Sequence, residues 1–504
     1  MEDVDTINTQ ILTESLDDLK GREKIIINAS LEEFISNPIE ILRKNIGKIN
    51  AIREKNNLEI NYLIKYKKGI SSILDKKRPD GSSTNNIFIS NFAYEFVEFK
   101  KGFTVGKPIK YVNTSDEKDD SMKYFNKYLM KVNKKSKDLD KYENLYTYGI
   151  AHTFIKYNPN KYDSEKDSPF IYEVIDSRNA CCVYSSDILN TKLFSMYVSK
   201  INRDNVSENI YTVYYGKKSL IFKVSNNDIE IIDGIKDEPI DDPITEYQLN
   251  QDRMGVFEPV LSSLKSMNFV RSNQLDDIQD FVNSYMIFVN QDAKYIINNI
   301  EDFKKNKIFC IKTNNEKAPA DVKLLKQSLE HSDINQLYND IKQDTFNQVG
   351  VPMATSNTGQ GVSGEAQTYG GGWENAQAIA NIQTTYISRY EREDLSKIIF
   401  ICKNAKNPKV KDIDDTDIEI KYTINKSNNI LTKMQSFKYW VDLGGSYERG
   451  LEICDLSEDS HTVGVETEKN NIERQKQNLE FEIEKEKQML ALKEENVDIN
   501  SDEN

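Results

Sequence analysis

Apolar residues recur at helical spacing on both sides of a small, polar stretch near the middle of the chain. The first series runs through 256–292 in steps of three to five positions: Val260, Leu264, Met267, Val270, Leu275, Ile278, Val282, Tyr285 and Val289. Such a stripe predicts one helix of roughly thirty residues, about 45 Å long, with Pro259 in its first turn. A second series predicts a helix over 332–350: Ile334, Leu337, Ile341, Phe346 and Val349. Gly350 and Pro352 then follow in the order expected at a helix end.

Between this helix and the next, residues 353–364 carry small and polar side chains with almost nothing to bury, so they are predicted to form a mobile loop. A further helical series follows: Trp373, Ile379, Ile382, Tyr386, Tyr390, Leu395 and Ile399. Ser363 is expected to cap this helix, and the glycines at 370–372 to weaken or kink its start. The loop either presents flexible backbone to a partner or is an ordinary surface connection.

The remainder of the chain predicts a mixture of helices and strands. Helices are predicted over 35–68, 87–101, 124–148 and, on either side of Gly444-Gly445, in 431–454. Residues 150–233 change to a period of two with many tyrosines and valines, which predicts a small β domain. Shorter strands are expected at 307–311, 322–325 and 418–422, and residues 237–243 are expected to form a link.

The two ends of the chain are polar and lack a sustained core pattern. Residues 1–34 are predicted to be an N-terminal arm, partly disordered. Residues 467–495 are highly charged and predict a solvated helix whose apolar members are Ile472, Leu479, Ile483 and Leu490. Residues 496–504 are predicted to be disordered.

Composition narrows the class of protein. The chain has 504 residues and a net charge of −14, which allows two to four domains and a substantial core. We find no apolar run long enough to span a bilayer, and the acidic N-terminus lacks the features of a secretory signal, so we expect no membrane and a cytoplasmic site of synthesis. Five cysteines without CxxC spacing argue against structural disulfides, and Cys181 and Cys182 are expected to be buried.

The sequence does not have the motifs of an enzyme. No GxxxxGK[ST] phosphate loop, GxSxG elbow or Cys-His pair is present, so no catalytic residue or cofactor is expected. The three histidines, His152, His331 and His461, lack metal-like spacing and are expected at the surface. Residues 414–417 are expected to form a solvated acidic turn, so no metal is expected. Lysines and aromatics in 127–141 fit either nucleic-acid binding or a charged helix face over a core.

The ordered set of motifs resembles the portal proteins of tailed double-stranded DNA bacteriophages, of the long-tailed siphophage type with Gram-positive hosts. The N-terminal motifs are YLIKYKKG at 62–69, NNIFISN at 85–91 and GFTVGKPI at 102–109. The β region contributes YGIA at 148–151 and VIDS at 174–177. The central motifs are FEPV at 257–260, SYMIF at 284–288, GVP at 350–352 and SGEA at 363–366. The resemblance covers roughly residues 35–455 in collinear order.

The resemblance implies an α+β, mainly helical portal fold. It places a wing of helices and a small β domain at 35–245, continued by a long helix and strand at 365–425. A two-helix stem follows at 246–292 and 332–350, with an α/β clip at 293–331 and a helical crown with a charged tail at 426–504. Residues 351–364 become the tunnel loop, and the positions expected to approach DNA are Val351, Pro352, Thr355, Ser356, Asn357, Thr358, Gly359, Gln360, Gly361 and Ser363. The expected stem-packing residues are Leu264, Ile278, Ile341 and Phe346.

The function implied is a homo-oligomeric ring, dodecameric in the virion, at one capsid vertex. Double-stranded DNA would pass through its channel during packaging and ejection. The implied partners are the large terminase subunit, the head-tail adaptor, and the major capsid and scaffold proteins. The alternatives are a minor head or scaffold-type structural protein without a channel, and a packaging ATPase or nuclease, against which the missing phosphate loop counts.

Overall fold

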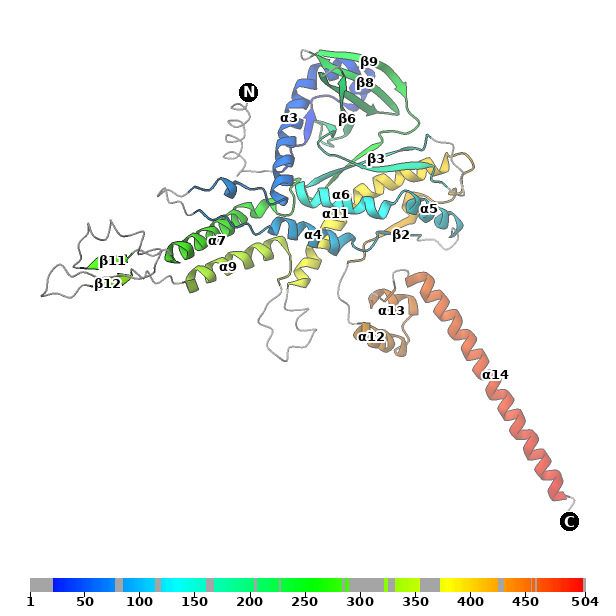
Figure 1. Ribbon diagram of the computed structural model, residues 1–504. Helices are drawn as coiled ribbons and strands as arrows, with labels where there is room; N and C mark the ends of the chain where they lie inside the picture. The colour runs from blue at the N-terminus through cyan, green and yellow to red at the C-terminus, as the bar shows by residue number, and fades with distance from the viewer. Residues whose placement is uncertain are drawn as a thin grey trace. The chain divides into compact units, whose positions relative to one another are not determined.

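The structure is a computed structural model and describes residues 21–77, 85–113, 119–159, 167–203, 206–225, 228–282, 286–289, 321–324, 331–353, 372–424, 430–454, 456–457 and 460–501 (Figure 1). The chain divides into two compact units. One comprises Met1–Gly106 and Ser115–Asp417, and the other Lys107–Thr114 and Ile418–Asn504. Both helices and sheets are present, so the predicted α+β class is confirmed.

The first unit contains a six-stranded sheet in the order β1-β5-β6-β7-β8-β9. Its strands are β1 (Ile25–Ile27), β5 (Ala180–Ser185), β6 (Lys192–Arg203), β7 (Val206–Tyr215), β8 (Lys218–Ser225) and β9 (Asp228–Asp237). β1 runs parallel to β5, and the other neighbours are antiparallel. Helices α2 (Leu31–Ser36) and α3 (Pro38–Lys67) contribute to the core of this sheet, where the rings of Phe34 and Phe194 stack with centroids 4.6 Å apart. The strands predicted within 150–233 are therefore present, and those from β5 onward lie in this sheet.

The described part of the N-terminal arm, residues 21–34, contains a strand and a helix start that the sequence pattern did not predict. Ile25 and Ile27 are buried in the sheet core, and the buried Arg22 pairs with Glu59 at 2.9 Å. Ser30 caps α2 through a reciprocal bond with Glu33. A three-residue strand has no readable periodicity, and its parallel partner lies more than 150 residues away (β5), so local pattern could not reveal it.

A three-stranded antiparallel sheet, β10-β3-β4, lies in the same unit. Its strands are β3 (Ile150–Tyr157), β4 (Phe170–Ile175) and β10 (Ile244–Gln248). α5 (Asp119–Lys131) and α6 (Lys134–Tyr148) precede it, and α6 and α11 (Trp373–Lys403) pack against it. The sequence predicted one helix over 124–148 and no strand β10. Asn133 adopts φ +53° between α5 and α6, which divides the predicted helix.

The central helices differ from the prediction at their ends. The first consists of a 3-10 turn, η4 (Glu258–Val260), and α7 (Leu261–Val282), so a single helix to residue 292 is wrong. Residues predicted to continue it form β11 (Met286–Val289), antiparallel to β12 (Asp321–Leu324). α9 (His331–Val349) confirms the second helix. The helix predicted over 87–101 is α4 (Phe92–Val105). It begins later than predicted because Asn91 is its N-cap, whose side chain accepts a hydrogen bond from the Tyr94 N–H. A short turn, η2 (Ser72–Asp75), follows α3.

The second unit pairs β2 (Lys110–Asn113) with β13 (Ile418–Lys421) and contains three helices. The 3-10 turn η5 (Asp415–Asp417) ends the first unit just before β13. α12 (Ile430–Asp442) and α13 (Tyr447–Ile453) flank Gly444-Gly445, as predicted. α14 (Ser460–Ser501) is a 42-residue helix, which confirms the charged helix but corrects the disorder predicted for 496–501. No helix in the described ranges combines the length and apolarity needed to cross a membrane.

Candidate functional site

The end of α9 is closed by a glycine turn at the root of the predicted loop. The Gly350 N–H donates to the Asn347 carbonyl at 3.1 Å, and the Val351 N–H donates to the Phe346 carbonyl at 3.0 Å. Gly350 adopts φ +69°, so this is the Schellman arrangement, with Phe346 and Val351 both buried. Pro352 follows and cannot continue the helix. The chain therefore leaves α9 in a fixed direction.

The chain returns to the same place at the start of α11. A β-carbon on Gly372, the N-cap residue, would lie 3.8 Å from the Cα of Pro352. The Asn375 amide donates to the Asn347 carbonyl at 3.2 Å, so α11 also bonds to the last turn of α9. The predicted cap Ser363 is wrong for this helix, because Gly372 occupies that position. The two ends of the segment that joins α9 to α11 therefore lie next to each other.

Aromatic side chains of α4 hold both ends of that segment. Phe92 and Phe96 meet the ring of Phe346 edge-on, with centroids 5.3 and 4.9 Å apart. One and two turns further along α4, Phe99 and Phe103 contact Trp373 at 5.9 and 6.0 Å. One rigid helix thus positions the end of α9 and the start of α11.

A buried cation lies beside the same turn. Lys100 of α4 is fully buried, and its Nζ has no hydrogen-bond partner among the described residues. This Nζ lies 3.3 Å from the place where a β-carbon on Gly350 would be. Burial lowers the pKa of Lys100 to about 8. The residues at the root of the loop therefore include an amine that loses its proton at mildly alkaline pH.

α7 and α9 lie side by side in Figure 1 and contact one another along polar and aromatic residues. The Arg271 guanidinium lies 3.8 Å from the centre of the Tyr338 ring, and its Nη1 is 3.2 Å from the Asn335 oxygen. The Gln274 amide also donates to Asn335, at 3.3 Å. These contacts hold α7 and α9 together side by side.

A stripe of small polar residues on α7, which sequence reasoning missed, holds an extended segment against the helix. The Phe88 N–H donates to the Ser272 hydroxyl at 2.9 Å, and the Ser90 N–H donates to Asn268 at 2.9 Å. Asp276 accepts from Lys76 at 2.7 Å and from the Asn86 N–H. Burial would raise the pKa of Asp276, but these bonds bring it below its usual value. The spacing of four between Asn268, Ser272 and Asp276 was the available signal.

A buried charge network joins α6 to α11. Glu391 accepts from Lys134 and, at 2.6 Å, from Lys141, while Asp394 accepts from Tyr247 at 2.6 Å and from Thr153. Burial alone would raise the pKa of Glu391, but the two ammonium groups hold it well below its usual range. Burial and the neighbouring Glu391 charge raise the pKa of Asp394. The network fixes the helix that leaves the loop to the β10-β3-β4 sheet.

One group of potential metal ligands occurs in the described part of the chain. Donor atoms of His152, Cys182 and Glu246 lie within 4.8 Å of one another, all buried, so the expectation of a surface His152 is wrong. Glu246 already binds the Arg253 guanidinium at 2.6 Å and His152 at 3.2 Å. Burial raises the pKa of the Cys182 thiol well above its usual value. A guanidinium thus supplies the positive charge, and the donor set fits a hydrogen-bonded network.

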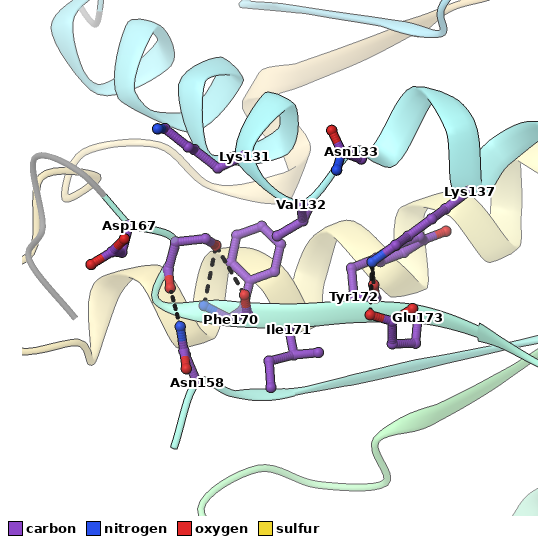
Figure 2. A pocket seen from close by; sticks show the side chains of 11 residues that line it. Lys131, Val132, Asn133, Lys137, Asn158, Asp167, Phe170, Ile171, Tyr172 and Glu173 are labelled. Carbon is purple, nitrogen blue, oxygen red and sulfur yellow. Dashed lines mark hydrogen bonds and ion pairs between the residues drawn. The ribbon is translucent and has the colours of Figure 1, made fainter. Parts of the chain in front are cut away.

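A pocket of about 340 Å³ lies beside the α5–α6 junction, and Figure 2 shows the side chains that line it. Lys137 of α6 donates to Glu173 of β4 at 2.8 Å, and Asn158, just after β3, donates to the carbonyl of Ser168, just before β4, at 3.0 Å. Lys137 and Asn158, two of the described lining residues, are thus already engaged in hydrogen bonds with other parts of the lining.

The predicted site residues fall into two groups. Val351 is buried and Pro352 half-buried at the loop root, whereas Thr355, Ser356, Asn357, Thr358, Gly359, Gln360, Gly361 and Ser363 lie outside the described residues. The predicted strand at 307–311 also lies outside them. Of the stem positions, Leu264 and Phe346 are buried, Ile341 is half-buried and Ile278 is 44% exposed within one chain.

Helices α7 and α9 pack side by side, and α4 contacts both the end of α9 and the start of α11. A model of the family described as phage portal protein, SPP1 Gp6-like, matches residues 46–480. The chain therefore belongs to this family of phage portal proteins, a structural family of bacteriophage capsids. No curated protein matches the chain.

Proposed function

We propose that copies of this chain form a closed ring at one vertex of a phage capsid, dodecameric in the virion. Double-stranded DNA passes through the central channel into the capsid and later out of it. Membership of the portal family supports this proposal. The α7–α9 pair supports it too, because identical wall segments joined head to tail close a channel.

The observation that carries the proposal is the rigid root of the loop. The Schellman turn at Gly350 and the return at Gly372 lie together between α4, α9 and α11. A loop fixed at both ends can project toward a channel without weakening the wall. Residues 351–364 include no Lys or Arg. The loop therefore suits a sliding contact through backbone and shape, because each neutralised phosphate would add affinity and resist movement.

In this proposal the wing comprises 35–245 and 365–425, the stem 246–292 and 332–350, the clip 293–331, the tunnel loop 351–364 and the crown 426–504. The clip docks the large terminase subunit during packaging and the head-tail adaptor afterwards. The wing faces the capsid and scaffold proteins.

Negative-stain electron microscopy of the purified chain, classified by rotational symmetry, tests the ring. Rings of about twelve subunits with a central hole are the expected result. The same measurement is repeated with capsid and scaffold proteins present, in case assembly needs them. A chain that forms no ring in either sample, or closed oligomers without a hole, would contradict the proposal.

A further inference from the structure

The C-terminal helix leaves its own unit after a short contact. Gly464 is buried against the backbone of Glu448, and the Asn471 amide donates to the Tyr447 hydroxyl of α13. From residue 472 to residue 489 every side chain is exposed. Figure 1 shows α14 continuing as a straight helix well past α12 and α13. With 42 residues, α14 is about 63 Å long, and its exposed stretch over 472–489 accounts for about 27 Å of that length.

One face of this free helix is apolar. Val465, Ile472, Leu479 and Ile483 are 51%, 49%, 61% and 45% exposed. At 100° per residue, their spacings of seven, seven and four keep all four within about 20° of one line. Leu490 follows seven residues later at the same register in the helix. Phe481 lies on the opposite face, where the Lys485 ammonium is 5.2 Å from its ring centre. The stripe is a narrow seam of the kind that packs against another helix.

The seam has opposite charge on its two sides. Between residues 463 and 489, only six other positions lie within about 60° of the stripe, and they form three consecutive pairs. These pairs are Glu468-Lys469, Gln475-Lys476 and Glu486-Lys487. The first member of each pair lies on one flank and the lysine on the other. One flank is therefore entirely lysine, and the other is glutamate and glutamine.

We propose that α14 packs against α14 of neighbouring copies of this chain, parallel and in register, with the stripe as the seam. In that arrangement the lysine flank of one helix faces the glutamate flank of the next, so Glu486 lies beside the partner's Lys487. Antiparallel packing would place like flanks together, and like charges repel. The proposal rests on the proposed ring, whose rotational symmetry makes neighbouring helices parallel.

The spacing of the apolar and charged positions along α14 also indicates how the packed helices would supercoil. Ile472 and Ile483, Leu479 and Leu490, and the pairs at 475–476 and 486–487 are each separated by 11 residues. An 11-residue repeat has 3.67 residues per turn, slightly more than a straight helix, and favours a gentle right-handed supercoil. The free part of α14 thus suits a ring of nearly straight, parallel helices continuing from the rest of the second unit.

A double-cysteine variant of the full chain tests the pairing. In Glu486→Cys/Lys487→Cys, each thiol should meet the complementary thiol of a neighbour, and mild oxidation should give a ladder of covalent oligomers longer than a dimer. The matched control is Gln477→Cys/Asn478→Cys, an equally exposed consecutive pair on the opposite face, which should give no ladder. The wild-type chain measures the background from the native cysteines, of which the four in the described residues are buried. Each single variant, Glu486→Cys or Lys487→Cys, should also fail to form a ladder, because head-to-tail packing joins unlike flanks.

The same samples are examined by electron microscopy, so that the two proposals are judged separately. Rings without a ladder, or rings in which the control forms an equal ladder, would overturn the proposed helix packing and leave the portal ring standing. A ladder without rings would support the packing of α14 and count against the ring. A sample that shows neither rings nor a ladder would overturn both proposals.

Discussion

The side chain of Ile379 on α11 fills the space in which Gly350 would need a β-carbon. The built β-carbon would overlap the Cδ1 atom of Ile379, and Gly350 adopts φ +69°, which an L side chain disfavours. The end of α9 therefore packs so closely against α11 that only glycine fits at position 350. This contact lies where the predicted loop begins.

Replacing Gly350 with Ala should destabilise the chain by about 2 kcal/mol or more, from backbone strain and displacement of Ile379. The measurement is the urea midpoint. Gly47→Ala is the control, since a β-carbon there meets nothing within 4 Å and α3 should gain up to about 1 kcal/mol. A Gly350→Ala chain as stable as the wild type would show that the turn does not need glycine.

Lys100→Met should stabilise the chain at pH 7. The folded-state pKa falls from 10.5 to about 8, a difference on the order of 3 kcal/mol. Below pH 8 both states bind the proton and the full penalty is present. Between about pH 8 and 10.5 the unfolded state binds more protons, so wild-type stability rises with pH and the advantage of the variant disappears. Urea midpoints at pH 7, 9 and 10.5 measure this convergence.

Lys101→Met is the matched control for that series. Lys101 pairs with Glu98 at 2.7 Å and with Glu143 at 2.9 Å, and its pKa is raised, so its removal should not stabilise the chain. A stability difference between Lys100→Met and wild type that stays constant from pH 7 to 10.5 would argue against an unpaired ammonium at this site.

Glu391→Gln should be among the most destabilising changes in the first unit. It leaves Lys134 and Lys141 buried with one carboxylate fewer, which costs about 3–5 kcal/mol. Because the folded-state pKa of Glu391 lies below 4.5, its stabilisation is complete above pH 4.5 and disappears as the pH falls through the lowered value. Thermal unfolding at pH 7 measures the cost of the substitution, and a series from pH 5 down to pH 2 follows the loss of the wild-type stabilisation.

Asp394→Asn provides the comparison for Glu391→Gln. The pKa of Asp394 is raised, so its charged form is disfavoured in the folded chain, and a neutral amide still accepts a bond from Tyr247. Its destabilisation should be clearly smaller. Equal losses for the two variants would mean that the network does not depend on the Glu391 charge.

Deletion of residues 357–361 should leave ring assembly intact but impair DNA packaging. The loop root depends on Gly350, Val351 and Gly372, none of which is removed. Electron microscopy measures assembly, and protection of packaged DNA from nuclease measures function. Normal packaging by the deletion variant would contradict the tunnel-loop proposal for residues 351–364.

Ile341→Asp should prevent stable rings by placing an unpaired charge at a half-buried position of α9. Asn339→Asp adds the same charge at an exposed position of the same helix and should still assemble. Rings from Ile341→Asp that resist dilution as well as wild-type rings would show that this residue does not lie at a packed interface.

The sequence by itself determined the features that depend on neighbouring residues. The 3.6-residue pattern gave α9, and Gly350 followed by Pro352 gave its end, because capping is a local property of the backbone. The period of two gave the strands within 150–233, and the glycines at 444–445 separated α12 from α13. The ordered motifs also led to the portal family that the family match confirmed.

Only the tertiary structure decided the features that depend on distant partners. Residues 286–289 continue a helical apolar pattern, yet they pair with Asp321–Leu324, because a short apolar run suits either structure until a partner is available. β1 needed β5, and β10 needed β3, before either was a strand. Lys100 and Glu391 look alike in a sequence as charged residues on helices. Burial makes one an unpaired amine and the other the centre of an ion network, because the cost of a charge depends on what surrounds it.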